Sequence, residues 1–131
     1  MRPTSRPTVV VVEDNDEVRG LLRATLERGG YRVVEAADGS EGSRAVTSAA
    51  PALVLLDIDL PDMNGLDLCR QLRASPATAR VPIVIVSAAI SHADQQAGLS
   101  AGADDYVTKP FSPRALLARV DERLGSTRAS G

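Results

Sequence analysis

The sequence alternates five times between a short apolar run and a segment in which apolar residues recur at helical spacing. The runs expected to be strands are residues 9–12, 31–36, 52–56, 82–86 and 106–108. Regular alternation of strand and helix favours parallel strands joined by right-handed crossovers. Because the runs at 9–12, 52–56 and 82–86 are almost continuously apolar, those strands are expected to be covered on both faces. The pattern predicts an α/β protein built on one open, parallel sheet.

Capping residues mark where the predicted helices begin and end. The expected starts are Asn15 or Asp16, Asp38, Asn64 and Ser112. The first helix is expected to stop at Gly29 and the last at Gly125. Residues 91–102 have the weakest helical pattern, because they contain few apolar side chains and include Gly98.

The length of the chain bounds the number of domains. At 131 residues it has room for one domain with a hydrophobic core and is too short for two. With 44% apolar and 24% charged residues, its composition is that of a globular protein. We expect residues 8–124 to form the domain, and residues 1–7 and 125–131 to be flexible tails.

Several classes of protein are disfavoured by the composition. No apolar run approaches the roughly 20 residues that span a bilayer, and the start of the sequence has no apolar signal segment. Only three aromatic residues and no basic block are present, which argues against direct nucleic-acid binding. The single cysteine, Cys69, excludes an internal disulfide and has the spacing of a packing residue on a helix. These features predict a cytoplasmic protein that does not enter a membrane.

Polar side chains follow four of the predicted strands at the point where each strand ends. Glu13 and Asp14 follow the first strand, Asp57 the third, Ser87 the fourth and Lys109 the fifth. In open parallel sheets, sites form at the carboxyl ends of the strands. We therefore expect these five side chains to meet at one edge of the sheet.

The three carboxylates in this set predict a metal site. Crowded together at a partly buried edge, Glu13, Asp14 and Asp57 repel one another, and a divalent cation offsets that repulsion. Mg²⁺ prefers a few carboxylate oxygens together with water and phosphate. A carboxylate such as Asp57, held rigidly after an apolar strand, is then a candidate nucleophile toward phosphorus. The simpler alternative is that Glu13 and Asp14 only begin a helix, where its dipole favours acids.

Lys109 and Ser87 complete what phosphoryl transfer requires, namely positioning and charge neutralisation. Lys109 is the only lysine among 15 basic residues, and its compact ammonium suits contact with a single phosphoryl oxygen. The alternatives are a surface lysine and a serine that merely ends a strand. The bond from Lys109 to Pro110 is a candidate for a cis peptide. Tyr106, just before this lysine, has a hydroxyl that needs water or a partner.

Four motifs together resemble the receiver domain of two-component response regulators, over roughly residues 8–124. They are residues 9–14 (VVVVED), 55–65 (LLDIDLPDMNG), 85–88 (IVSA) and 102–111 (GADDYVTKPF). The resemblance implies a single (βα)₅ flavodoxin-like domain, a doubly wound parallel sheet with strand order 2-1-3-4-5. It implies a signalling role in which a histidine kinase, a phosphotransfer protein or a small phosphodonor phosphorylates Asp57.

The same resemblance implies roles for the site residues. Asp14, Asp57 and the backbone carbonyl of Asp59 would bind Mg²⁺ directly, and Glu13 would act through water. The phosphoryl oxygens would be contacted by Ser87 and Lys109.

The resemblance also implies a switch and an output. Ser87 and an inward turn of Tyr106 would remodel the surface for a downstream protein, a missing output domain or a phosphorylation-dependent dimer. Three residues depart from the commonest pattern of the family. Glu13 and Asn64 each stand where Asp is more usual, and Asp59 occupies a position that influences phosphoryl lifetime.

Two alternatives remain open at the level of sequence. Asp57 and Asp59 after an apolar strand also resemble the nucleophile and general acid of haloacid dehalogenase-type phosphatases. In that family the metal-binding acids follow the lysine, whereas here Glu13 and Asp14 precede the nucleophile, and the chain has little room for a substrate-selecting cap. The second alternative is a receiver-like interaction module that is never phosphorylated.

Overall fold

A computed structural model describes residues 6–88 and 91–129 of the chain, and its centre is a five-stranded parallel sheet. The strands are β1 (Thr8–Val12), β2 (Arg32–Ala36), β3 (Leu53–Leu56), β4 (Ile83–Ser87) and β5 (Asp105–Thr108). Their order across the sheet is β2-β1-β3-β4-β5, and all four neighbouring pairs are parallel. The predicted fold class and strand order are confirmed.

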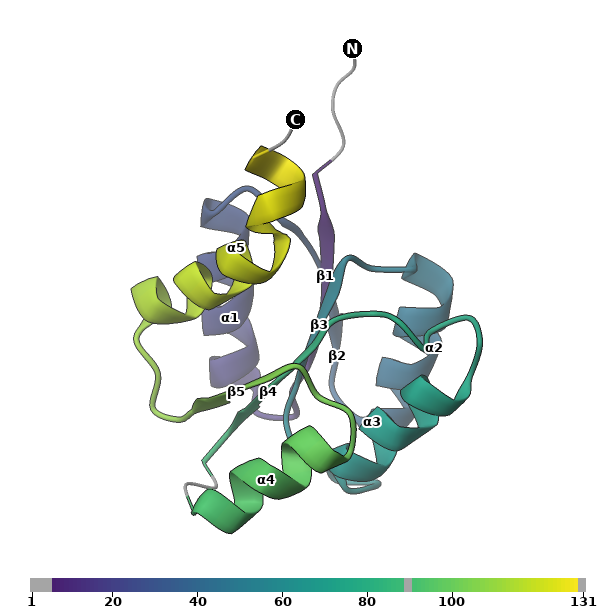
Figure 1. Cartoon of the computed structure of the whole chain (residues 1–131). Coiled ribbons are helices and arrows are strands. Elements are labelled where there is room, and N and C mark those ends of the chain that lie inside the picture. Colours follow the sequence, from purple (N-terminus) through teal and green to yellow (C-terminus); the bar gives the residue numbers. More distant parts are fainter. Residues whose placement is uncertain (1–5, 89–90, 130–131) are drawn as a thin grey trace.

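Helices cover both faces of the sheet, as Figure 1 shows. The first face carries α1 (Asp16–Arg28) and α5 (Pro113–Ala129), and the second carries α2 (Gly39–Ala49), α3 (Gly65–Ala74) and α4 (His92–Ser100). Alternate residues of the central strands point to opposite faces, so each strand contributes to two separate cores. Val9 and Val11 pack with α1 and α5, whereas Val10 and Val12 pack with α2 and α3.

The expected capping residues begin the helices. Side-chain oxygens of Asn15, Asp38, Asn64 and Ser112 accept backbone N–H groups of the first turns at 2.7–3.2 Å. The first helix ends at Gly29, as predicted.

The predicted stop of the last helix at Gly125 is wrong, because α5 continues to Ala129. A glycine inside a helix costs only about 1 kcal/mol, and no proline follows to break the backbone hydrogen bonds. Residues 125–129, predicted as tail, are therefore helical. The outermost parts of the two predicted tails, residues 1–5 and 130–131, lie outside the described residues.

The segment with the weakest helical pattern in the sequence forms α4. The Ser91 side chain caps it by accepting the backbone N–H of Asp94 at 3.0 Å. Gly98 lets the helix backbone pack directly on the sheet, since a Cβ at this position would lie 2.8 Å from the Cδ1 of Ile85 and 3.3 Å from the Tyr106 ring. The close approach of α4 to the sheet at Gly98 thus takes the place of the stripe of apolar side chains that this segment lacks.

Cys69 lies in the core between the sheet and α3, which confirms that it is a packing residue. Burial raises the pKa of its thiol, so the reactive thiolate is disfavoured. Within the described part of the chain, no helix combines the length and the apolar character needed to cross a bilayer.

Candidate functional site

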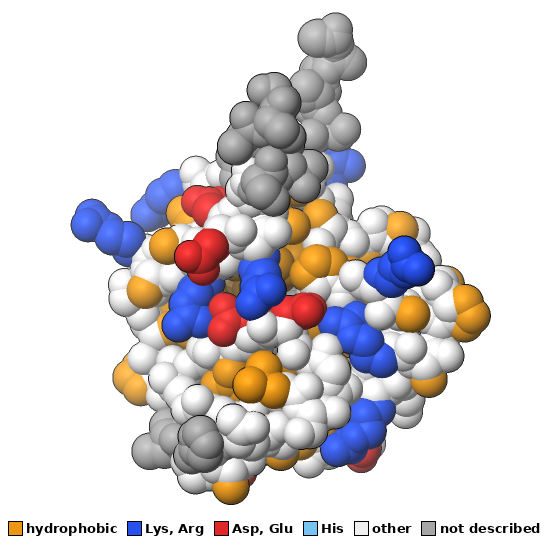
Figure 2. Space-filling view, in the orientation of Figure 1, with side chains coloured by type: hydrophobic (Ala, Val, Ile, Leu, Met, Phe, Trp, Pro, Cys, Tyr) orange, Lys and Arg blue, Asp and Glu red, His pale blue; other side chains and the backbone are white. Residues whose placement is uncertain are grey.

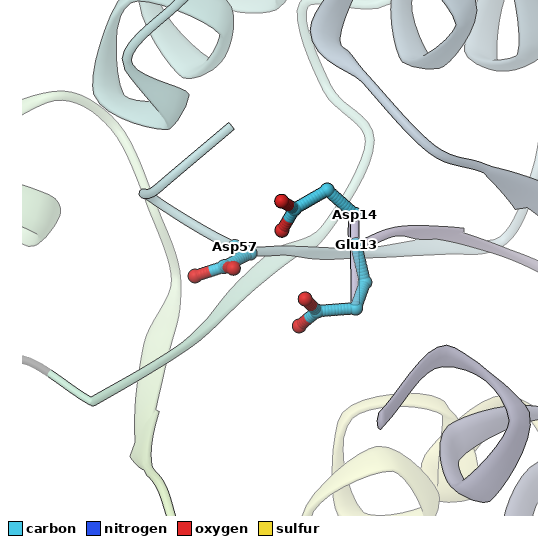
Figure 3. Close-up of side chains that lie close together, drawn as sticks. All are labelled: Glu13, Asp14 and Asp57. Carbon is cyan, nitrogen blue, oxygen red and sulfur yellow. The ribbon is translucent and has the colours of Figure 1, made fainter. Parts of the chain in front are cut away.

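Three carboxylates converge at the carboxyl edge of the sheet. Val12 of β1 is in register with Leu56 of β3, so the residues that follow, Glu13 and Asp57, lie side by side. One carboxylate oxygen from each of Glu13, Asp14 and Asp57 lies within 4.8 Å of the others. Figure 3 shows all three side chains extending to the same side from the ends of β1 and β3. Glu13 and Asp57 are buried, whereas Asp14 is exposed.

Lys109 brings a positive charge into this acidic cluster from the end of β5. Its Nζ donates to Oε1 of Glu13 at 2.7 Å and to Oδ2 of Asp57 at 3.3 Å. Its backbone N–H donates to the carbonyl of Ser87 at 2.9 Å, and the bond to Pro110 is cis. Burial alone would lower the pKa of this ammonium, but the hydrogen bond to Glu13 and the charges of both acids outweigh burial, so the pKa is raised. The structure thus gives Lys109 a close ion pair with Glu13, which the sequence does not indicate.

Ser87 and Tyr106 lie on the neighbouring strands β4 and β5. Ser87 ends β4 in a fully buried position, and Tyr106 of β5 is in register with Ile85 two residues earlier. Burial raises the pKa of the Tyr106 phenol, and a hydrogen bond with the Ser87 side chain partly offsets that rise. The two residues predicted to form the switch are therefore in direct contact.

The loop between β3 and α3 is tied down at several points. The backbone N–H of Asp59 donates to Oδ1 of Asp57 at 3.3 Å. The Asp62 carboxylate accepts the backbone N–H groups of Gly39 and Ser40 at 2.8 and 3.0 Å, so it caps α2 from another loop. The N–H of Gly39 lowers the pKa of this carboxyl. Sequence analysis missed this cap, because an acid in a turn-rich loop carries no signal for a helix more than 20 residues away.

The residues of the cluster fit a small divalent cation. Carboxylate oxygens are hard donors of the kind that Mg²⁺ prefers, and exposed Asp14 leaves the cluster open to water and to an incoming ligand. The three acids outnumber the single ammonium that neutralises them. Binding of the cation by the backbone carbonyl of Asp59 stays a prediction.

Crowding perturbs Asp57 strongly. Burial and, next to it, the charge of Glu13 raise its pKa, Lys109 opposes both effects, and the net result is a pKa raised from 3.8 to about 6. Proton binding at Asp57 is therefore easier in the folded chain than in the unfolded one. The charged form that prevails at neutral pH destabilises the fold when no cation is bound.

A pH dependence of stability is expected from this shift. Because the folded pKa lies above the unfolded one, the free energy of unfolding of metal-free protein should rise as pH falls through about 6. Because water reaches the carboxyl edge of the sheet, the contribution of Asp57 to the change in the free energy of unfolding is expected to be about 1–2 kcal/mol. Urea denaturation with EDTA at pH 5 and pH 7.5 measures it, with Asp57→Asn as reference. The variant should be the more stable protein at pH 7.5, with a smaller advantage at pH 5; an equal difference at both values would contradict the expectation.

Comparison with known proteins identifies the family. The profile of the response regulator receiver domain matches residues 9–121. The DNA-binding response regulator MtrA of Mycolicibacterium smegmatis is 45% identical over 121 residues, which cover 92% of this chain and 52% of that protein. The chain thus spans about half the length of the curated relatives it matches. The matches do not support the phosphatase alternative.

Solved structures agree with this assignment. A putative response regulator from Chloroflexus aurantiacus superposes with a TM-score of 0.88 at 35% identity, covering 92% of this chain and 99% of that one. The receiver domain of sensor histidine kinase PA1611 from Pseudomonas aeruginosa, with a magnesium ion coordinated in its active site cleft, has a TM-score of 0.85 at 31% identity over the same shares. Sequence, fold and acidic cluster agree, and the chain belongs to the response regulator receiver domain family of two-component systems.

Proposed function

We propose that this chain is a reversible signalling switch that accepts a phosphoryl group on Asp57. The observation that carries the proposal is the meeting of three carboxylates and the only lysine at the carboxyl edge of the sheet. Asp57 is held rigidly at the end of a buried strand, and its backbone N–H donates to the carbonyl of Val12 at 3.0 Å. Its carboxylate is thereby positioned as a nucleophile.

In the transfer step, an Oδ of Asp57 forms a bond to phosphorus. The bond from phosphorus to the donor breaks, and the leaving group, an imidazole nitrogen or an acetate oxygen, keeps the electron pair. Lys109 neutralises charge on the phosphoryl oxygens, for which its Nζ is already within 3.3 Å of Asp57. The Ser87 hydroxyl donates to a second phosphoryl oxygen.

The cofactor of this reaction is Mg²⁺, held by Asp14, Asp57 and the backbone carbonyl of Asp59. When bound, the cation neutralises the acids and the incoming phosphoryl charge. Glu13 acts through water, in keeping with its ion pair to Lys109. The magnesium ion in the cleft of the PA1611 receiver domain supports this assignment.

Ser87 and Tyr106 transmit the modification to the surface. A Ser87 hydroxyl that turns toward the phosphoryl group changes its contact with Tyr106. Tyr106 and Gln95 line a hollow of about 380 Å³ between α4, β5 and α5, with Arg119 at its rim. Figure 2 shows acidic and basic side chains close together over this part of the molecule. The ion pair between Arg119 and Asp105, at 2.7 Å, is available for exchange with a partner.

The proposed partners follow from the same chemistry. A sensor histidine kinase or phosphotransfer protein supplies the phosphoryl group in the cytoplasm. The output is a downstream protein, an attached output domain or a phosphorylation-dependent dimer. Direct contact with DNA is not proposed for this chain, which matches only 52% of the length of MtrA, a relative named as DNA-binding.

Beryllofluoride, a phosphoryl mimic, tests the proposal. With Mg²⁺ it should shift the amide NMR signals of Ser87 and Tyr106, because the proposed path runs from Asp57 through Ser87 to Tyr106. Mg²⁺ alone and Asp57→Asn with both reagents are the controls. An unchanged spectrum, or an equal response in Asp57→Asn, would overturn the proposed switch and favour an interaction module that is never phosphorylated.

A further inference from the structure

Arg19, on the first turns of α1, reaches back to the backbone of the acid pair. Its Nη1 donates to the carbonyl of Glu13 at 2.9 Å and lies 3.5 Å from the carbonyl of Asp14. Its Nη2 donates to Oδ1 of Asp16 at 2.6 Å. Only 18% of this side chain is exposed, so the guanidinium is packed into the turn that joins β1 to α1.

The neighbouring strand fixes Arg19 in turn. Glu35 of β2 is in register with Val11, and its Oε1 accepts from Nε of Arg19 at 3.1 Å. The other oxygen of Glu35 accepts from Nη1 of Arg23 at 2.5 Å. The planar guanidinium of Arg19 has donors on three sides, so it donates at once to the two carbonyls and the two carboxylates around it. An ammonium cannot do this.

Glu13 is consequently held both at its backbone carbonyl and at its side-chain carboxylate. Its carbonyl accepts from Arg19, while its carboxylate accepts from Lys109 at 2.7 Å and from the backbone N–H of Asn15 at 3.0 Å. The turn that carries Glu13 and Asp14 is short, so the direction of both carboxylates depends on how their carbonyls are held.

We propose that Arg19 is a positioning residue that aligns Glu13 and Asp14 for the divalent cation. This inference rests on the proposed magnesium site. Its expected effect on Mg²⁺ affinity is opposite to that of a purely electrostatic role. A positive charge near the cluster repels a cation, so removal of the Arg19 charge alone would tighten Mg²⁺ binding. Loss of alignment predicts the opposite, because groups that orient metal ligands support metal affinity.

The test compares Arg19→Met with Arg23→Met. Both variants lose one arginine from α1 and one partner of Glu35, but Arg23 pairs with Glu27 and Glu35 and has no hydrogen bond to the acid pair among those described. The Mg²⁺ dissociation constant is measured by NMR titration of folded protein. Arg19→Met is expected to weaken binding by about tenfold, and Arg23→Met to change it by less than about twofold. Arg19→Lys should fall between wild type and Arg19→Met.

A metal-free measurement separates alignment from affinity. In EDTA, hydrogen exchange of the Asn15 amide, which donates to Glu13, should accelerate in Arg19→Met and not in Arg23→Met. Unchanged or tighter Mg²⁺ binding by Arg19→Met would overturn the positioning role while leaving the proposed function intact. If Arg19→Met does not fold, Arg19→Lys and Glu35→Gln replace it. Unchanged Mg²⁺ binding by both of these variants would also overturn the positioning role. Failure of the unaltered protein to bind Mg²⁺ would overturn both proposals.

Discussion

Replacing Asp57 with asparagine is expected to slow phosphorylation by acetyl phosphate and Mg²⁺ by at least about a thousandfold. Asparagine keeps the size of the side chain, but its amide does not attack phosphorus. No other acid of the cluster is placed to substitute, because Glu13 is engaged by Lys109 and Asp14 is exposed on the neighbouring strand end. Intact-protein mass spectrometry measures the gain of one phosphoryl group with time.

The control for this variant is Asp67→Asn, which makes the same chemical change on the exposed side of α3. Asp67 pairs with Arg70 and lies outside the acidic cluster. It should be phosphorylated at the rate of the unaltered protein. A phosphorylated Asp57→Asn variant would place the acceptor elsewhere and contradict the proposed role of Asp57.

Gly65→Ala is expected to lower the free energy of unfolding by about 2–3 kcal/mol and to weaken Mg²⁺ binding. A Cβ at Gly65 would lie 2.1 Å from the carbonyl oxygen of Asp57 and 2.7 Å from the Cα of Ile58. These are backbone atoms, so no rotation of a side chain relieves the overlap. The start of α3 and the end of β3 must separate, which moves Asp57 relative to Glu13 and Asp14. Urea denaturation gives the stability, and NMR titration gives the Mg²⁺ affinity.

Gly20→Ala provides the matched substitution. Gly20 lies on the exposed side of α1, and a Cβ there would meet no atom within 4 Å. Alanine is the better helix former, so this variant should gain about 0.5–1 kcal/mol. If Gly65→Ala proved as stable as the unaltered protein, the close approach between α3 and β3 would not constrain the site.

The sequence was sufficient to predict the sheet and the position of the site. Glu13, Asp57 and Ser87 each end an apolar run, so parallel strands bring them to one edge whatever the details of packing. The same reasoning located Lys109 after β5, although its ion pair with Glu13 depends on side-chain conformation. The roles of these residues stay proposals.

Other features depend on contacts between distant segments, and the sequence does not reveal them. Arg19 reads as an ordinary arginine on a helix, because the carbonyls that it contacts have no signature in the sequence. The Asp62 cap joins two loops far apart in the chain. Gly125 failed as a stop signal, because a glycine inside a helix costs only about 1 kcal/mol and no proline follows it to break the backbone hydrogen bonds.

The ion pairs of Lys109 have a consequence for the order in which ligands enter the pocket. Three carboxylates and one ammonium leave an excess of two negative charges, which repels a phosphodonor of the same sign. A divalent cation held by these acids would cancel that excess, so a donor is expected to enter more readily once the cation is bound. If Asp57 is phosphorylated as proposed, Mg²⁺ is expected to be a precondition for phosphorylation, and the kinetics should follow an ordered rather than a random sequence of binding.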